Sequence, residues 1–131
     1  MTYSYTATTD QDFDDTVGRV KEAFKEQGFG VLTEIDIQAT LEEKIGVKTD
    51  RFLILGACNP GFASRALEAE PGVGVFLPCN VVVRRSDGRT VIEAMDPAVM
   101  QQFFEAPQLG ELIGEVAPRI KAAVAKAAGN P

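Results

Sequence analysis

The two cysteines are the residues of this chain best suited to chemistry, and each is followed at once by an asparagine. Cys58-Asn59 comes directly after one apolar run, and Cys79-Asn80 lies inside the next. Two thiols on adjacent strands can form a disulfide if their Cα atoms come within about 6 Å of each other. They can also hold a soft metal such as Cu(I) or Zn²⁺. Two ligands are too few for a closed tetrahedral zinc site, so the sequence specifies no metal site by itself.

The chain contains no histidine among its 131 residues. A Ser-His-Asp or Cys-His catalytic arrangement cannot be built within it, and neither can a metal site with imidazole ligands. Any chemistry must use cysteine, carboxylate, lysine, tyrosine or backbone groups. The sequence leaves open whether the protein is an enzyme, and it points to no particular cofactor.

Composition and charge exclude several classes of protein. The net charge is −6, which argues against nucleic-acid binding because such binding depends on Lys and Arg neutralising phosphates. The only basic cluster is Arg84, Arg85 and Arg89, which is read as solvated charge around a hairpin turn. No apolar run approaches the roughly 18 residues of a membrane span, and the first ten residues lack a secretory signal. We expect one domain over residues 1–131 and a cytoplasmic location.

Hydrophobic periodicity predicts a strand, a helix, four more strands with short helices between them, and a long C-terminal helical region. The expected strands are residues 2–8, 30–38, 52–58, 73–83 and 90–95. The expected helices begin at Thr9 or Asp10, at Thr40, at Asn59-Pro60 and at Asp96-Pro97, and Gly28 and Gly46 end the first two. Asp87-Gly88 predicts a hairpin turn. Pro118 should kink or divide the last helix.

This order predicts an α+β fold in two layers, in which the N- and C-terminal helices grip one face of a mainly antiparallel sheet. The other sheet face then needs cover. Apolar residues on both faces of the 52–58 strand indicate either a ligand groove or a dimer interface there.

Several candidate site residues also have ordinary structural explanations. Glu34 and Asp36 share one face of the 30–38 strand, where paired acids suit acid–base or metal chemistry but are more often a solvent-facing surface. Asn59 has a complete explanation as a helix N-cap. Cys58 is harder to dismiss, because a helix N-terminus beside it would favour its thiolate. Pro78, next to Cys79, predicts a bulge, a bend or an edge in its strand.

Four segments together resemble the family called domain of unknown function 302. They are GFGVLTEIDI (28–37), LGACNP (55–60), RALEAEP (65–71) and LPCNVVV (77–83), in the same order over nearly the whole chain. The resemblance implies a helix-grip or TATA-binding-protein-like fold (strand, helix, four strands, helix), usually dimeric, and no assigned activity. The positions that match the motif are Glu34, Cys58, Asn59, Pro60, Pro78, Cys79 and Asn80. Val75-Phe76 departs from the two leucine-like residues expected there.

Three functional hypotheses follow. In the first, a small or apolar ligand binds in a groove beside the sheet, with Glu34, Asn59 and Asn80 as polar anchors near the cysteines. In the second, Cys58 and Cys79 form a redox or soft-metal site. In the third, the protein is a structural homodimer whose cysteines are small buried hydrophobes. An apolar cavity lined by Glu34 and both asparagines would favour the first hypothesis, and neighbouring accessible thiols would favour the second.

Overall fold

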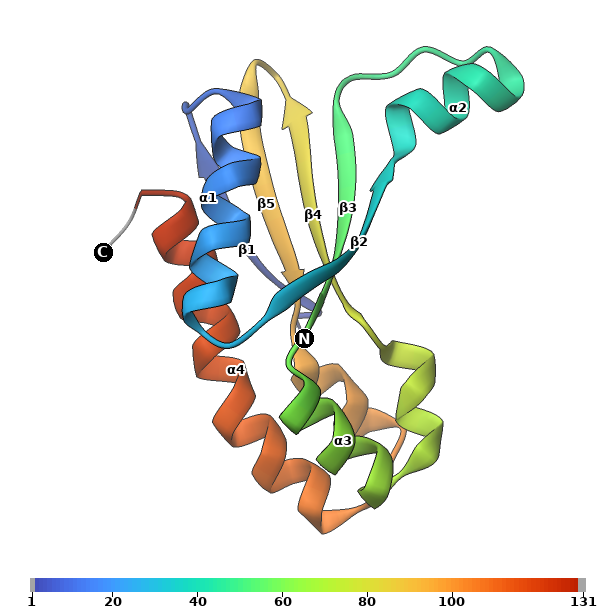
Figure 1. Cartoon of the computed structure of the whole chain (residues 1–131), viewed down its shortest axis with the longest axis vertical. Coiled ribbons are helices and arrows are strands. Elements are labelled where there is room, and N and C mark those ends of the chain that lie inside the picture. Colours follow the sequence, from blue (N-terminus) through green and yellow to red (C-terminus); the bar gives the residue numbers. More distant parts are fainter. Residues whose placement is uncertain (1, 130–131) are drawn as a thin grey trace.

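The computed structural model describes residues 2–129, and its centre is one five-stranded antiparallel sheet (Figure 1). The strand order across the sheet is β1-β5-β4-β3-β2. The strands are β1 (Ser4–Thr9), β2 (Gly30–Asp36), β3 (Phe52–Cys58), β4 (Cys79–Ser86) and β5 (Arg89–Met95). The hairpin turn predicted between β4 and β5 is present, because Asp87 and Gly88 both have positive φ, 51° and 76°.

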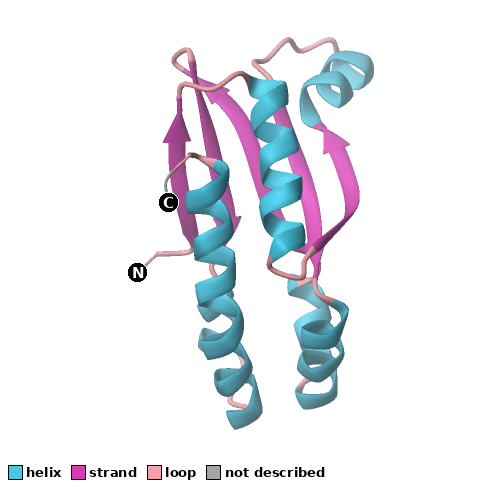
Figure 2. Cartoon of the chain, turned by 60° about the vertical axis from the view of Figure 1, so that its left-hand side comes forward, coloured by secondary structure: helices cyan, strands magenta, loops and turns pink. Residues whose placement is uncertain are grey.

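Two long helices cover one face of this sheet, as Figure 2 shows. The α-helices are α1 (Phe13–Glu26), α2 (Ile37–Ile45), α3 (Pro60–Ala69) and α4 (Pro107–Ala127), and two 3₁₀ helices are η1 (Pro71–Phe76) and η2 (Pro97–Gln102). The predicted fold class, a two-layer α+β arrangement gripped by N- and C-terminal helices, is confirmed. Within the described part of the chain, no helix has the length and hydropathy needed to cross a bilayer.

Strand register decides which side chains meet the helices. Ile35 of β2 lies opposite Ile54 of β3, which lies opposite Val82 of β4, and Val82 lies opposite Glu93 of β5. Since directly opposed residues share a face, this row belongs to the side without helices, which we call the open face. Leu53, the next residue on β3, turns toward the helices and is buried.

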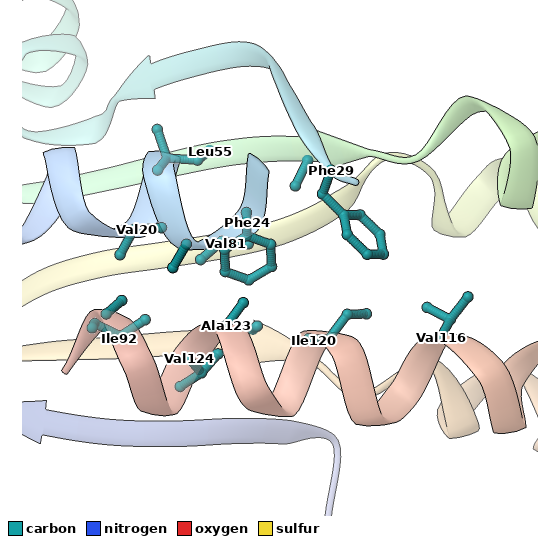
Figure 3. Close-up of a cluster of buried hydrophobic side chains, with 14 of the residues drawn as sticks. Val20, Phe24, Phe29, Leu55, Val81, Ile92, Val116, Ile120, Ala123 and Val124 are labelled. Carbon is teal, nitrogen blue, oxygen red and sulfur yellow. The ribbon is translucent and has the colours of Figure 1, made fainter. Parts of the chain in front are cut away.

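The hydrophobic core lies between the sheet and the pair α1 and α4 (Figure 3). Phe24 of α1 and Ile120 of α4 are each 1% exposed, and Leu55 of β3 is fully buried. Phe24 meets Phe29 edge to face, with 6.0 Å between the ring centroids. Figure 3 places Phe29 and Val116 at one end of this core, and that end borders the site described below.

Two helix starts differ from the prediction. The N-cap of α1 is Asp12, whose side chain accepts from the Asp15 amide at 3.1 Å, and it is neither Thr9 nor Asp10. The N-cap of α2 is Asp36, so this helix begins before Thr40. A carboxylate placed directly before the first helical turn accepts a free amide in both cases. The predicted helix ends are confirmed, because Gly28 and Gly46 follow their helices with φ of 86° and 68°.

The predicted strand over 73–83 is wrong in its first half. Residues 71–76 form η1, and β4 begins only at Cys79, immediately after Pro78. Pro71 and two glycines disfavour an extended ladder in this stretch, and Pro78 lacks the amide that a strand interior needs. The helix α4 is also not divided at Pro118. Pro118 and Gly114, the residue one turn earlier, are both exposed, so the missing backbone bond faces water.

The prediction that β2 buries one face is also wrong. Leu32 and Ile35 are 67% and 48% exposed, and no residue of β2 is fully buried. The strand is at the edge of the sheet and leads into α2, which projects away from α1 and has no buried residue (Figure 1). Only Val31, near the start of the strand, is partly buried and packs against the core, so the alternating sequence records two faces of a strand without one that is buried along its length.

Candidate functional site

The sheet brings the two Cys-Asn motifs to the same end of neighbouring strands. Cys58 is the last residue of β3 and Cys79 is the first of β4. The strands run antiparallel, with Ala57 directly opposite Cys79, so the end of one strand meets the start of the other. Twenty residues separate the cysteines in sequence, and the sheet places them side by side. Both cysteines are free thiols.

Both cysteines line one small cavity at this end of the core, which we call the cysteine cavity. Its volume is about 40 Å³, and it is partly open to solvent. Asn59 is the one polar residue beside the cysteines in its wall. The rest of the wall is apolar and comes from α3, η2, α4 and single residues of the sheet and its connections. It includes Phe29, Ala57, Phe62, Ala66, Leu77, Met100, Leu112 and Val116. The cavity is therefore an apolar space with sulfur atoms on its wall.

Burial keeps the Cys79 thiol protonated. Burial, with a smaller contribution from the nearby charge of Cys58, raises the pKa of this thiol from 9.0 to about 11. The thiolate is the nucleophilic form of cysteine, so Cys79 is a poor nucleophile at neutral pH.

Asn59 serves as the N-cap of α3, as its sequence context predicts. Its Oδ1 accepts from the Phe62 amide at 3.2 Å, and Pro60 occupies the first helical turn. Its amide nitrogen lies where a side chain on Gly28 would stand, 2.8 Å from an ideal Cβ there. The close approach of these two segments fixes the Asn59 side chain in the cavity wall.

Glu34 lies outside the cysteine cavity. It is opposite Leu55 in the β2–β3 register, and its carboxylate forms an ion pair with Lys21 at 3.1 Å. It shares a shallow groove with Asp36 and Arg51, away from both cysteines. Each partner of the Lys21 ion pair is nearly half exposed, which is typical of a solvated surface pair.

Asn80 also lies outside the cysteine cavity. It is exposed on the open face, opposite Gly56, and borders a shallow groove with Tyr3 and Glu93. Side chains alternate along a strand, so Cys79 points into the core and the next residue points out of it. Of the five residues predicted for the site, the structure brings together Cys58, Asn59 and Cys79, and it separates Glu34 and Asn80 from them.

Pro78, another residue of the predicted motif, packs against the backbone of β3. An ideal Cβ on Gly56 would stand 2.8 Å from Pro78 Cγ and 2.2 Å from Thr33 Oγ1. Gly56 therefore allows β2, β3 and the residue before Cys79 to approach closely. Its role is steric, and it was not among the predicted site residues.

The helical part of the cavity wall was missed by sequence reasoning. Met100 of η2 and Leu112 of α4 belong to apolar stripes that the sequence shows only as buried helix faces. Among residues 2–129, no group of three or more His, Cys, Asp or Glu side chains is placed to hold a metal ion. That statement does not cover methionine, which is a soft ligand.

Comparisons with known proteins agree on one family. The family model described as "Domain of unknown function DUF302" matches residues 5–127. A crystal structure of an uncharacterized conserved protein DUF302 from Bacillus stearothermophilus is similar with a TM-score of 0.89 and 30% sequence identity. The match covers 98% of this chain and 99% of that one. A search of curated proteins gave no match. The resemblance drawn from the four sequence segments is thereby confirmed.

Proposed function

Because this chain belongs to the family of the domain of unknown function DUF302, whose description assigns no activity, we propose a function from its site alone: the protein binds a small apolar ligand in the cysteine cavity. One observation carries this proposal. Cys58, Asn59 and Cys79 line an apolar cavity that continues the core and is partly open to solvent. Apolar walls with one or two polar groups are the usual form of a small-molecule site.

The cavity volume limits the ligand. At about 40 Å³ the cavity is far smaller than the roughly 300 Å³ or more of a site for a drug-sized molecule. The buried part of the ligand is therefore small, about the size of one or two methyl groups. Asn59 supplies the polar group at the wall, while Glu34 and Asn80 lie too far around the fold to contribute.

A redox role for the cysteines has less support. Such a role needs a thiolate at neutral pH, and burial in the apolar wall raises the pKa of Cys79 to about 11. The same burial suits a thiol that acts as a small hydrophobic wall residue. The apolar-ligand reading therefore explains the surroundings of Cys79 better than a disulfide-exchange reading.

Xenon is a suitable first probe, because small apolar cavities that stay dry bind it. Under xenon pressure, the methyl NMR signals of Ala66 and Val116 should shift in a saturable way. Ala63→Leu, which adds bulk at the cavity wall, should abolish the shifts. Ser64→Leu places the same leucine side chain at the next position of α3, which is exposed, and should leave the xenon-induced shifts unchanged. Shifts spread evenly over the core, or equal in both variants, would contradict the proposal.

We also propose that a second copy of this chain covers the open face. Five strands about 4.8 Å apart and about 24 Å long present roughly 500 Å². A stable interface buries about 800 Å² per partner. The exposed side chains of the β2–α2 arm, including Leu32, Ile35 and Ile45, add apolar area beside this face.

The dimer proposal predicts that a charge on the open face separates the two copies. Wild-type protein should sediment as a dimer at micromolar concentration, and Ile54→Lys should sediment as a monomer, because the new charge would have to be buried without a partner. Leu67→Lys, at an exposed position of α3, is the matched control and should remain dimeric. Wild-type protein that sediments as a monomer at every concentration would refute the proposal.

A further inference from the structure

An arginine stands at the opening of the cysteine cavity. The cavity wall from α4 and η2 is buried, whereas Asn59 and Phe62 around the start of α3 are only half-buried, so the cavity opens on that side. The guanidinium of Arg119 lies over the Phe62 ring there, 5.3 Å from its centroid. We propose that the site binds a short-chain carboxylate, with its alkyl end in the cysteine cavity and its carboxylate on Arg119 and Asn59. This inference rests on the proposed function, because it names the class of molecule that the same cavity takes.

Two hydrogen-bond donors converge beside Gly28 at this opening. An ideal Cβ on Gly28 would stand 2.8 Å from Asn59 Nδ2 and 3.9 Å from a guanidinium nitrogen of Arg119. Gly28 has φ 86°, a conformation that favours glycine, so no side chain fills the point between these donors. Asn59 Oδ1 is engaged as the N-cap of α3, while within residues 2–129 no acceptor meets its Nδ2. An amide and a guanidinium therefore have N–H groups available around one point.

The charge of Arg119 is available for an anion. No carboxylate of the described residues forms an ion pair with Arg119. The other cation over the Phe62 ring, Arg65, is paired with Glu115 at 2.8 Å, so that pair adds no net charge. One positive charge therefore remains at the opening. A planar guanidinium suits a carboxylate well, because it can donate two parallel hydrogen bonds to the two oxygens.

The helix α4 places the charge and the cavity wall on one side. Val116 lines the cavity, and Arg119 follows three residues later on the same helix face. Figure 3 shows Val116 at the same end of the core as Phe29, the neighbour of Gly28. The cavity volume of about 40 Å³ takes only one or two methyl groups. Acetate and propionate therefore fit the site, and a long-chain fatty acid does not.

The test is titration of the full-length chain with sodium propionate, followed by the methyl NMR signals of Ala66 and Val116, with sodium chloride at equal ionic strength as the reference. Wild-type protein should show saturable shifts. Propionamide, the uncharged isostere, and the variant Arg119→Gln should each weaken binding at least about tenfold. Lys121→Gln is the matched control. It removes the same charge two residues along α4, on the other side of the helix, and should keep wild-type affinity.

Asn59→Asp separates the anion site from the apolar cavity. Aspartate caps a helix about as well as asparagine, so the start of α3 should be retained. The new carboxylate replaces the amide donor and repels the anion, so propionate binding should be lost. The xenon-induced shifts of Ala66 and Val116 should remain, because the apolar wall is unchanged.

Several outcomes would overturn the carboxylate site. Failure of wild-type protein to bind propionate would do so, and so would equal affinity for propionate and propionamide. Propionate binding that Ala63→Leu leaves unchanged would show that the alkyl end is not in the cavity. A protein that binds xenon but not propionate would refute the carboxylate site alone, whereas one that binds neither would refute the proposed function as well.

Discussion

Replacing Gly56 by alanine should lower the free energy of unfolding by about 3 kcal/mol. The new Cβ would stand 2.2 Å from Thr33 Oγ1 and 2.8 Å from Pro78 Cγ. Neither neighbour can move away easily, since threonine is stiff at χ1 and the proline ring is fixed to its own backbone. Relief of the overlap therefore requires strands β2 and β3, or the residues before Cys79, to separate.

Urea unfolding of the variant measures this loss, and Gly30→Ala provides the matched control. Gly30 is also in this sheet, but a Cβ there would meet nothing within 4 Å. Its replacement should be neutral or stabilising by a few tenths of a kcal/mol, because alanine has fewer unfolded conformations to lose. Adding Thr33→Ala to Gly56→Ala should recover part of the loss. Equal stability of the Gly56 and Gly30 variants would show that the close approach is not tight.

The fold was predictable where local chemistry and tertiary packing agree. The apolar stripe of α1, its end at Gly28 and the turn at Asp87-Gly88 each follow from short-range rules, and the structure confirms them. The stretch over 71–76 was not predictable in the same way. Its valines favour a strand, whereas its proline and glycines allow a tight helix, and packing of Val73 into the core selects the second.

The exposed strand β2 shows the limit of periodicity. An alternating pattern says that a strand has two different faces, but burial depends on where the helix layer ends. That boundary is set by the packing of α1 against α4, about a hundred residues apart in sequence. The sequence of β2 therefore predicted its conformation correctly and its surroundings incorrectly.

The candidate site also contains residues whose positions the sequence predicted and residues whose positions it did not. The cysteines end one strand and begin its neighbour, as the sequence predicted, and Ala57 rather than Cys58 lies directly opposite Cys79. Glu34 and Asn80 were placed with them by a motif resemblance, but strand alternation turns Asn80 outward and the edge strand carries Glu34 to Lys21. Met100 could not have been found from its own segment, because its place in the cavity depends on contacts between η2 and the sheet.

The second large effect expected is a loss of stability at high pH that depends on Cys79. Below pH 9 the thiol is protonated in both the folded and the unfolded chain, so it does not lower the free energy of unfolding there. Between pH 9 and about 11 the unfolded chain releases the proton while the folded chain retains it, because burial raises the folded pKa to about 11. The free energy of unfolding should fall by about 3 kcal/mol over this window, since each pKa unit corresponds to about 1.4 kcal/mol.

Comparison with Cys79→Ala isolates this contribution from other groups that titrate at high pH. The variant should lack the additional slope between pH 9 and 11 in urea unfolding. Cys58→Ala leaves a single thiol, whose ultraviolet thiolate absorbance reports the Cys79 pKa directly. Burial is the larger cause of the raised pKa and the charge of Cys58 the smaller one, so Cys79 should still titrate well above 9 in this variant. A midpoint near 9 would mean that the thiol is solvated, and the cysteine cavity would then be too wet for an apolar ligand.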